Sequence, residues 1–194
     1  MTKIRIVGGQ WRGRALEAPE GRGTRPTTER SREAFSSMVL SAFDLDLSEV
    51  QVLDAFAGSG ALGLELLSRG ARGCTFVERD RRAAGAIRRN LAALGLGRDE
   101  ARLVVADVLR AGTSGRPLPG GPFSLVVLDP PYALEATDVA ALVSGLAASG
   151  QLADNARVLY EHDAKRPGLV LPGFRTVKER ARGITAVDLL ERED

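Results

Sequence analysis

The sequence has few of the residues that form disulfides, metal sites and membrane spans. Its 194 residues include one cysteine and one histidine. Cys74 alone cannot form an internal disulfide, and together with His162 it cannot supply the ligands of a usual zinc site. We therefore expect no metal centre, although the sequence leaves metal binding by carboxylates alone open. No apolar run reaches the roughly 18 residues of a membrane helix, and no charged-then-apolar leader precedes Lys3 and Arg5. We therefore expect a cytoplasmic protein with no membrane partner.

The charges nearly balance in total but are unevenly distributed. The chain has 27 Lys and Arg against 25 Asp and Glu, for a formal net charge of +2. Residues 1–35 carry eight basic and four acidic side chains, so the rest of the chain is slightly acidic. An apolar content of 44% is typical of a globular domain and excludes a disordered chain.

The amino-terminal segment predicts a small β-hairpin followed by a helix. Apolar and basic residues alternate from Ile4, Gly8-Gly9 interrupts the pattern, and a second short strand ends at Leu16. A turn-rich stretch follows over 18–28. Thr27 or Thr28 then caps a helix. The expected apolar face of this helix consists of Ala34, Phe35, Met38, Val39 and Ala42.

From residue 51 onward, predicted strands and helices alternate, which favours an α/β fold with a mostly parallel sheet and helices on both faces. The segment 112–122, rich in glycine and proline, is expected to be a surface loop. Ligands of such sheets bind at the carboxyl ends of the strands, near the point where the strand order reverses. The expected strands are 52–56, 74–77, 103–106, 125–128, 157–160 and 184–190, and the expected helices are 61–69, 81–94 and 136–148.

A glycine-rich turn joins the first of these strands to its helix. Gly58, Gly60 and Gly63 form a G-x-G-x-x-G pattern, which alone favours a nicotinamide dinucleotide bound at the helix amino terminus. Asp54 argues against that ligand, because its carboxylate would repel a pyrophosphate but could accept hydrogen bonds from an ammonium group. A non-catalytic reading, in which these residues only shape a helix turn, remains open for each residue taken singly.

Three acidic residues at the ends of three successive strands favour one cofactor. Asp54 suits an α-amino group, Glu78 suits two ribose hydroxyls, and Asp107 suits an adenine amino group. S-adenosylmethionine joins an α-amino acid to an adenosine and needs all three acceptors. We therefore predict S-adenosylmethionine as the cofactor.

The tetrapeptide Asp129-Pro130-Pro131-Tyr132 follows the fourth core strand. An exocyclic amine on a base is a poor nucleophile, since its lone pair is delocalised into the ring. The Asp129 carboxylate and the Pro130 carbonyl could accept the two amine hydrogens and turn that lone pair toward a methyl group, while Tyr132 stacks on the base. A strand-ending turn is the alternative interpretation. Cys74 and His162 are expected to be structural rather than catalytic.

These motifs, in this order, resemble those of the bacterial 16S ribosomal RNA guanine-N2 methyltransferases of the RsmD type. The resemblance covers nearly the whole chain. It implies a Rossmann-like class I S-adenosylmethionine-dependent methyltransferase with a mostly parallel seven-stranded sheet and a small N-terminal β-hairpin. We divide the chain into a hairpin and basic arm, 1–27, and a methyltransferase domain, 28–194. The segments that carry the resemblance are IRIVGGQWRGRAL, RPTTERSREAF, VLDAFAGSGALGLELLSRGA, VERD, NLAALGL, DPPY and YEH.

The resemblance also implies a substrate and a set of site residues. The substrate is one guanine of 16S RNA in the small ribosomal subunit or its assembly intermediate, and we expect a monomeric enzyme. In this chain Arg182 stands where the family more often has a tyrosine, and Ala55 replaces a larger aliphatic residue. The cofactor residues are Asp54, Ala57, Gly58, Ser59, Gly60, Glu78 and Asp107, and the catalytic residues are Asp129, Pro130 and Tyr132.

The arginines of the basic arm, 1–27, predict contacts with RNA. Its arginines could bind phosphates and its tryptophan could stack on a base; the alternative is a solvated charged face with the tryptophan packed in the core. The candidate RNA-binding residues are Arg5, Trp11, Arg12, Arg14 and Arg25.

Three other functions remain open from sequence. DNA adenine-N6 methyltransferases share the DPPY tetrapeptide, although this chain is short for a separate target-recognition domain. An NAD-dependent oxidoreductase is supported only by the glycine pattern. A non-catalytic RNA-binding module leaves Asp54, Glu78 and Asp129 without a role.

Overall fold

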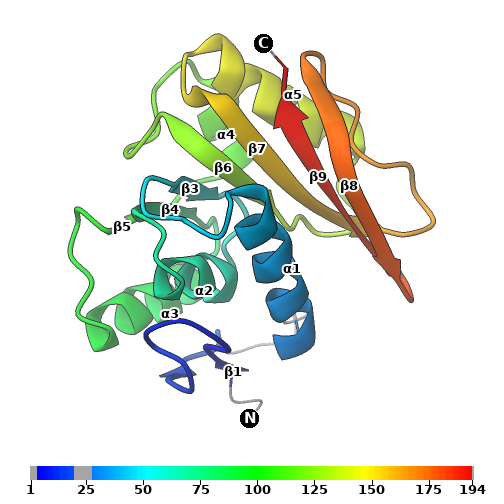
Figure 1. Ribbon diagram of the computed structural model, residues 1–194. Coiled ribbons are helices and arrows are strands. Elements are labelled where there is room, and N and C mark those ends of the chain that lie inside the picture. The colour runs from blue at the N-terminus through cyan, green and yellow to red at the C-terminus, as the bar shows by residue number, and fades with distance from the viewer. Residues whose placement is uncertain (1–3, 20–27, 194) are drawn as a thin grey trace.

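The computed structural model describes residues 4–19 and 28–193, and these form a seven-stranded sheet between two layers of helices (Figure 1). The strand order is β5-β4-β3-β6-β7-β9-β8. Strands β3 to β7 pair in parallel, whereas β9 pairs antiparallel with both β7 and β8. The strands of this sheet are β3 (Gln51–Asp54), β4 (Gly73–Val77), β5 (Ala101–Val104), β6 (Phe123–Leu128), β7 (Leu152–Asp163), β8 (Phe174–Arg182) and β9 (Thr185–Arg192).

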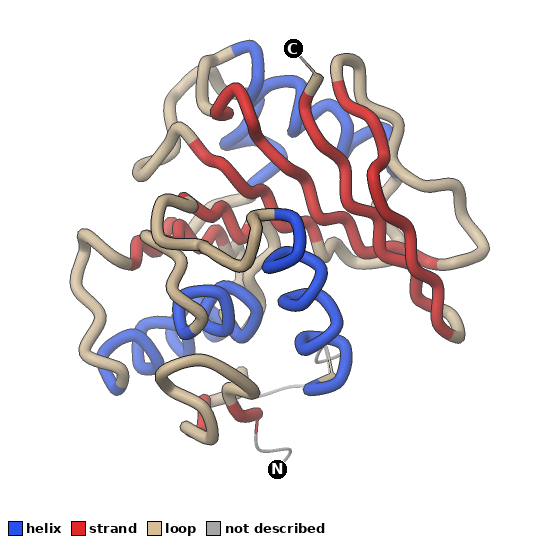
Figure 2. The backbone as a smooth tube through the Cα atoms, viewed as in Figure 1, coloured by secondary structure: helices blue, strands red, loops and turns tan. Residues whose placement is uncertain are grey.

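The two faces of the sheet carry separate apolar cores, because side chains alternate across each strand. One core joins Val52 and Val127 of the sheet to α1, α2 and α3. The other joins Leu53 and Val126 to α4 and α5. The helices are α1 (Glu29–Ala42), α2 (Ala61–Ser68), α3 (Arg81–Ala93), α4 (Val108–Thr113) and α5 (Ala136–Ala148). The predicted α/β fold is confirmed (Figure 2).

Local signals account for the helix boundaries. The Thr28 side chain caps α1 by accepting a hydrogen bond from the Ser31 amide, as the sequence predicts. Gly70 and Gly95, with φ of 102° and 72°, follow the ends of α2 and α3. The expected apolar face of α1 is buried at Phe35, Met38 and Val39.

Several sequence expectations differ from the structure. Helix α4 is absent from the expected set, and its last two residues, Gly112 and Thr113, fall in the segment expected to be a loop. Both are poor helix formers, yet Asp107 caps the first turn. The third core strand lies at Ala101–Val104 and not at 103–106. The strand expected at 157–160 is part of the twelve-residue β7. Strand β8 is absent from the expected set, because its sequence FRTVKERAR lacks an apolar face.

The amino-terminal hairpin forms as expected and packs on the domain. Its strands β1 (Ile4–Arg5) and β2 (Ala15–Leu16) pair antiparallel. Ile4, Ile6 and Leu16 belong to the same buried cluster as α1 and α2. None of the described helices has the length and apolar character needed to cross a membrane.

Candidate active site at the carboxyl edge of the sheet

The sheet brings the predicted acidic residues to one edge, on either side of the point where the strand order reverses. Along the chain β3, β4 and β5 are added in one direction and β6 and β7 in the other, so β3 and β6 are neighbours. Asp54 ends β3 and lies in register with Phe76 of β4 and Val127 of β6. Glu78 and Asp129 each lie two residues beyond those partners, so backbone alternation directs both toward the face that carries Asp54.

Asp54 is a buried carboxyl group among other carboxylates. It is 3% exposed, and its Oδ2 accepts a hydrogen bond of 3.1 Å from the Gly63 amide. The pKa of Asp54 is raised to about 7, mainly by burial and also by the charges of Asp129 and Glu78, while the hydrogen bond from Gly63 lowers it. A cation bound here would relieve this repulsion, which fits an ammonium or sulfonium ligand better than a phosphate.

The glycine loop allows the backbone to pass close to that carboxyl group. Gly58 and Gly60 have φ of 53° and 75°, a left-handed conformation that glycine adopts without strain. Gly60 is the N-cap of α2. Gly63 faces Asp54 so closely that a Cβ there would lie 2.9 Å from Asp54 Oδ2 and would overlap the Phe76 ring. The third glycine of the pattern is therefore required by packing.

Glu78 and Asp107 already hold backbone groups in the structure. Glu78 Oε2 accepts from the Gly58 amide at 2.7 Å, and its Oε1 accepts from the Asp80 amide at 2.7 Å. Glu78 thereby ties the glycine loop to the end of β4. Asp107 Oδ1 accepts from the Leu109 amide at 3.0 Å as the N-cap of α4. Each carboxylate oxygen has a second lone pair that a ligand hydroxyl or amine can use.

The tetrapeptide that begins at Asp129 comes immediately after β6, the strand that pairs with β3 at Asp54. Pro130 is buried, whereas Asp129 and Tyr132 are partly exposed. The Tyr132 hydroxyl shares a 3.0 Å hydrogen bond with Thr185 Oγ1 and donates to Glu161 Oε1 at 3.4 Å. Sequence reasoning missed Thr185 and Glu161, which come from β9 and β7 and fix the tyrosine from 53 and 29 residues away.

His162 lies behind the tetrapeptide and is held on both sides. Its Nε2 lies 3.1 Å from Asp188 Oδ2 and its Nδ1 lies 3.0 Å from the Asp163 carbonyl oxygen. The imidazole also stacks on Tyr160, with ring centroids 5.0 Å apart. Tyr160 and His162 line a small pocket together with Pro130 and Tyr132. Cys74 is fully buried in β4.

The hairpin that carries the predicted RNA-binding residues is anchored on α2. Glu65, which is fully buried, accepts from the Val7 and Gly8 amides at 2.8 and 2.7 Å. Its carboxylate also pairs with Arg69 at 2.9 Å. The Trp11 amide donates to Ser68 Oγ at 3.0 Å.

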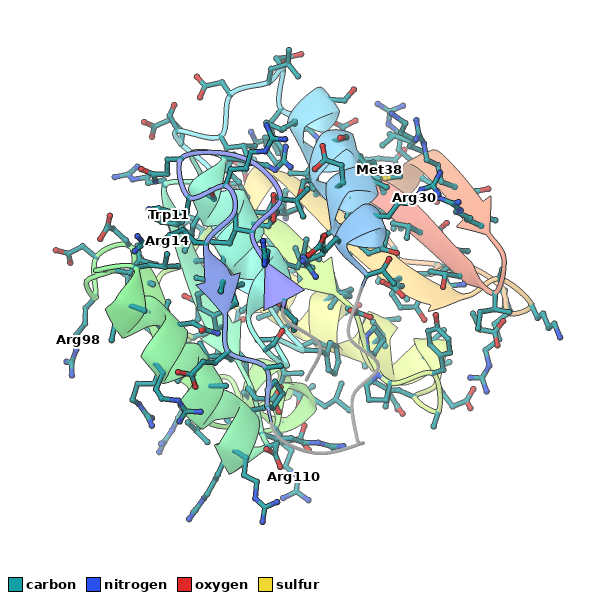
Figure 3. The ribbon with its side chains drawn as sticks, turned by 90° about the horizontal axis from the view of Figure 1, so that it is seen from below. Trp11, Arg14, Arg30, Met38, Arg98 and Arg110 are labelled. Carbon is teal, nitrogen blue, oxygen red and sulfur yellow. The ribbon has the colours of Figure 1, made fainter. Side chains whose placement is uncertain are left out.

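The predicted RNA-binding residues differ in their surroundings. Trp11 is partly buried against the core, as the alternative to base stacking expects. Arg5, Arg12 and Arg14 are exposed, and Arg14 reaches the Ala93 carbonyl of α3 at 3.0 Å (Figure 3). Arg25 lies outside the described residues.

Comparison with known proteins gives consistent matches over the whole length. The model of a family described as conserved hypothetical protein 95 matches residues 4–191. Ribosomal RNA small subunit methyltransferase D of Escherichia coli K12 is 38% identical over 195 residues, covering 98% of this chain and 91% of that protein.

Solved structures agree with this match. A putative methyltransferase, yhhF of Escherichia coli, superposes with a TM-score of 0.80 at 36% identity, covering 99% of both chains. Magnesium protoporphyrin IX methyltransferase from Synechocystis, solved with bound SAM, has a TM-score of 0.62 at 20% identity, covering 89% of this chain and 87% of its own. That second likeness is of fold alone. The predicted methyltransferase fold is confirmed.

Proposed function

The chain belongs to the conserved hypothetical protein 95 family, and on that premise we propose that it transfers a methyl group from S-adenosylmethionine to N2 of one guanine in 16S ribosomal RNA. A homologue of 38% identity over nearly the full length is named as a small-subunit ribosomal RNA methyltransferase, which supports this substrate. The observation that carries the proposal is the register of β3 and β6, which sets the Asp54 end of the glycine loop beside Asp129 of the tetrapeptide.

The residues at the edge fit the cofactor group by group. Asp54 would hold the ammonium group, Glu78 the ribose hydroxyls and Asp107 the adenine amine, while Ala57, Gly58, Ser59 and Gly60 form the turn that lets the ligand approach the backbone. The raised pKa of Asp54, about 7, supports a cationic ligand, because a positive charge there offsets the repulsion of Asp129 and Glu78. When bound, the cofactor supplies an electrophilic methyl group and leaves as a neutral thioether.

The tetrapeptide would orient the guanine amine. Asp129 and the Pro130 carbonyl accept its two hydrogens, so that the nitrogen lone pair points toward the methyl group. S-adenosylmethionine would supply the methyl group to this nitrogen, and Asp129 or water would accept the proton that the amine then loses. Tyr132 stacks on the base, with its hydroxyl fixed by Thr185 and Glu161, so little reorganisation is needed on binding.

We further propose how the protein contacts RNA and how its chain is organised. The exposed Arg5, Arg12 and Arg14, with Arg25, would contact RNA phosphates, and the partly buried Trp11 would stack on a base. We also propose that the enzyme acts as a monomer. A ribosomal substrate supports a cytoplasmic location. We also propose that the chain consists of a hairpin arm, 1–27, and a methyltransferase domain, 28–194.

Transfer of a labelled methyl group tests the proposal. The protein, labelled S-adenosylmethionine and small ribosomal subunits that lack the modification should yield N2-methylguanosine after nuclease digestion, and Asp129→Ala should reduce the yield strongly. Label in N6-methyladenine of DNA would favour the adenine methyltransferase instead. Calorimetry with S-adenosylhomocysteine and NAD separates the oxidoreductase, since only the former should bind.

A further inference from the structure

Strand β8 forms the outer edge of the sheet and is largely open to solvent (Figure 1). Seven of its nine residues are exposed. It carries four basic side chains, Arg175, Lys178, Arg180 and Arg182, which we call the β8 strip. The proposed function assigns no role to these four residues.

A β-bulge places the whole β8 strip on one face of the sheet. Arg180 and Arg182 lie opposite Val187 and Thr185 of β9, and Lys178 lies opposite Leu189. The register then shifts between Thr176 and Lys178, so that Arg175 lies opposite Glu191. Since all four partners occupy odd-numbered positions of β9, all four cations point the same way. Without the extra residue, Arg175 and Lys178, three apart, would point to opposite faces.

That face is the one that carries the proposed methyl-acceptor site. Leu189 and Val187 belong to the core shared with α1, and Thr185, in the same alternation, hydrogen-bonds the Tyr132 hydroxyl at 3.0 Å. Arg182 is paired with Thr185 across the hairpin. The β8 strip therefore begins beside the proposed base-stacking tyrosine and leads away from it along the sheet edge.

The cations nearest the site have no acidic partner within the described part of the chain. Arg175 pairs with Glu191 at 2.9 Å, as does Arg157 of β7 at 2.7 Å, so one carboxylate serves two arginines. Among residues 4–19 and 28–193, no ion pair involves Lys178, Arg180 or Arg182. The acidic residue of this stretch, Glu179, lies opposite Asp188 and points to the other face.

A groove runs between the β8 strip and α1. It has a cavity volume of about 230 Å³ and is lined by Met38 and Ser41 of α1 and by Val177, Lys178 and Leu189 of the sheet. Met38 lies on the side of α1 that faces the hairpin of β8 and β9 (Figure 3). Because seven of the nine residues of β8 are exposed, a partner can lie along the strand without displacing a helix.

We propose that the β8 strip binds the phosphate backbone of the RNA that presents its guanine at Tyr132. Successive residues on one face of a strand are about 6.6 Å apart, a spacing comparable to that of neighbouring phosphates along one RNA strand. Lys178, Arg180 and Arg182 would each contact one phosphate, while Arg175 orders Glu191. Backbone contacts of this kind position the nucleic acid and leave base selection to the site. The inference rests on the proposed function, because it needs an RNA substrate.

The test compares a strip variant with a matched control. The variant is Lys178→Ala/Arg180→Ala/Arg182→Ala. The control, Arg98→Ala/Arg116→Ala, also removes exposed arginines, but from loops that lead to the amino ends of β5 and β6, at the opposite edge of the sheet. Each protein is titrated with a 16S RNA fragment at 50 to 200 mM salt, S-adenosylhomocysteine binding is measured by calorimetry, and methyl transfer to small ribosomal subunits is followed.

Each phosphate contact to single-stranded RNA contributes roughly 0.7 to the slope of log affinity against log salt. Loss of three contacts in the strip variant should therefore make this slope shallower by about 2. Its KM for subunits should rise at least tenfold, with S-adenosylhomocysteine affinity unchanged, whereas the control matches the wild type. An unchanged slope overturns the inference, and a KM rise with an unchanged slope does so too, because it assigns the strip to a ribosomal protein. If wild-type protein neither binds nor methylates RNA, the proposed function itself fails.

Discussion

Replacing Asp54 by asparagine should stabilise the free protein and weaken its proposed binding of the cofactor. The carboxyl group is 3% exposed, and burial raises its pKa from 3.8 to about 7. A group whose folded-state pKa is raised costs stability as the pH rises from the unfolded pKa through the folded one. At about 1.4 kcal/mol per pKa unit, the cost above pH 7 reaches about 4 kcal/mol.

Asparagine has the same shape and can still accept the hydrogen bond from the Gly63 amide. Part of the gain is offset, because its NH₂ group must be desolvated. We expect Asp54→Asn to exceed the wild type by about 1–3 kcal/mol at pH 8 and to show no advantage at pH 4. Urea denaturation at a series of pH values measures this difference, which should grow between pH 4 and 7 and then level off.

The same substitution should weaken the cofactor product. Loss of one charge-assisted hydrogen bond, worth about 1.5–3 kcal/mol, reduces S-adenosylhomocysteine affinity roughly 10- to 150-fold by calorimetry. Wild-type affinity should itself fall as the pH drops below about 7, because Asp54 becomes protonated. A variant that is no more stable at pH 8, or that binds as tightly as the wild type, would refute the electrostatic account of this edge.

Three further substitutions test separate parts of the structure. Asp129→Asn should lower kcat for methyl transfer by at least a hundredfold while S-adenosylhomocysteine still binds in calorimetry, because the residue acts on the acceptor; unchanged kcat would exclude it from catalysis. Gly63→Ala should cost about 1–3 kcal/mol in denaturant unfolding, since its Cβ overlaps the Phe76 ring. Glu65→Gln should increase hydrogen exchange at the Val7 and Gly8 amides, whereas exchange there should be unaffected by Glu49→Gln, which alters an exposed ion pair.

The catalytic edge follows from sequence because its signals are local. Each strand end is marked by its own acidic residue, and a glycine turn identifies the first strand-to-helix crossover. Parallel pairing then brings Asp54, Glu78 and Asp129 to one edge, whatever the exact strand boundaries.

The supports of the site do not follow from sequence, since they depend on long-range pairing. Thr185 reaches Tyr132 only through the antiparallel return of β9. The polar sequence of β8 forms a strand because β9 supplies its hydrogen-bond partners, and the shift near Val177 that aligns its cations leaves no local signature. The sequence predicts the hairpin but not its anchor, which is Glu65 of α2, 57 residues away from Gly8.

Mass spectrometry of 16S RNA from cells with and without the protein tests whether the protein methylates this RNA. Deletion should remove N2-methylation from one guanine, and wild-type protein should restore it where Asp129→Asn does not. An unchanged set of N2-methylguanosines in the deletion strain would contradict the proposed activity, whatever the affinity of the purified protein for S-adenosylmethionine.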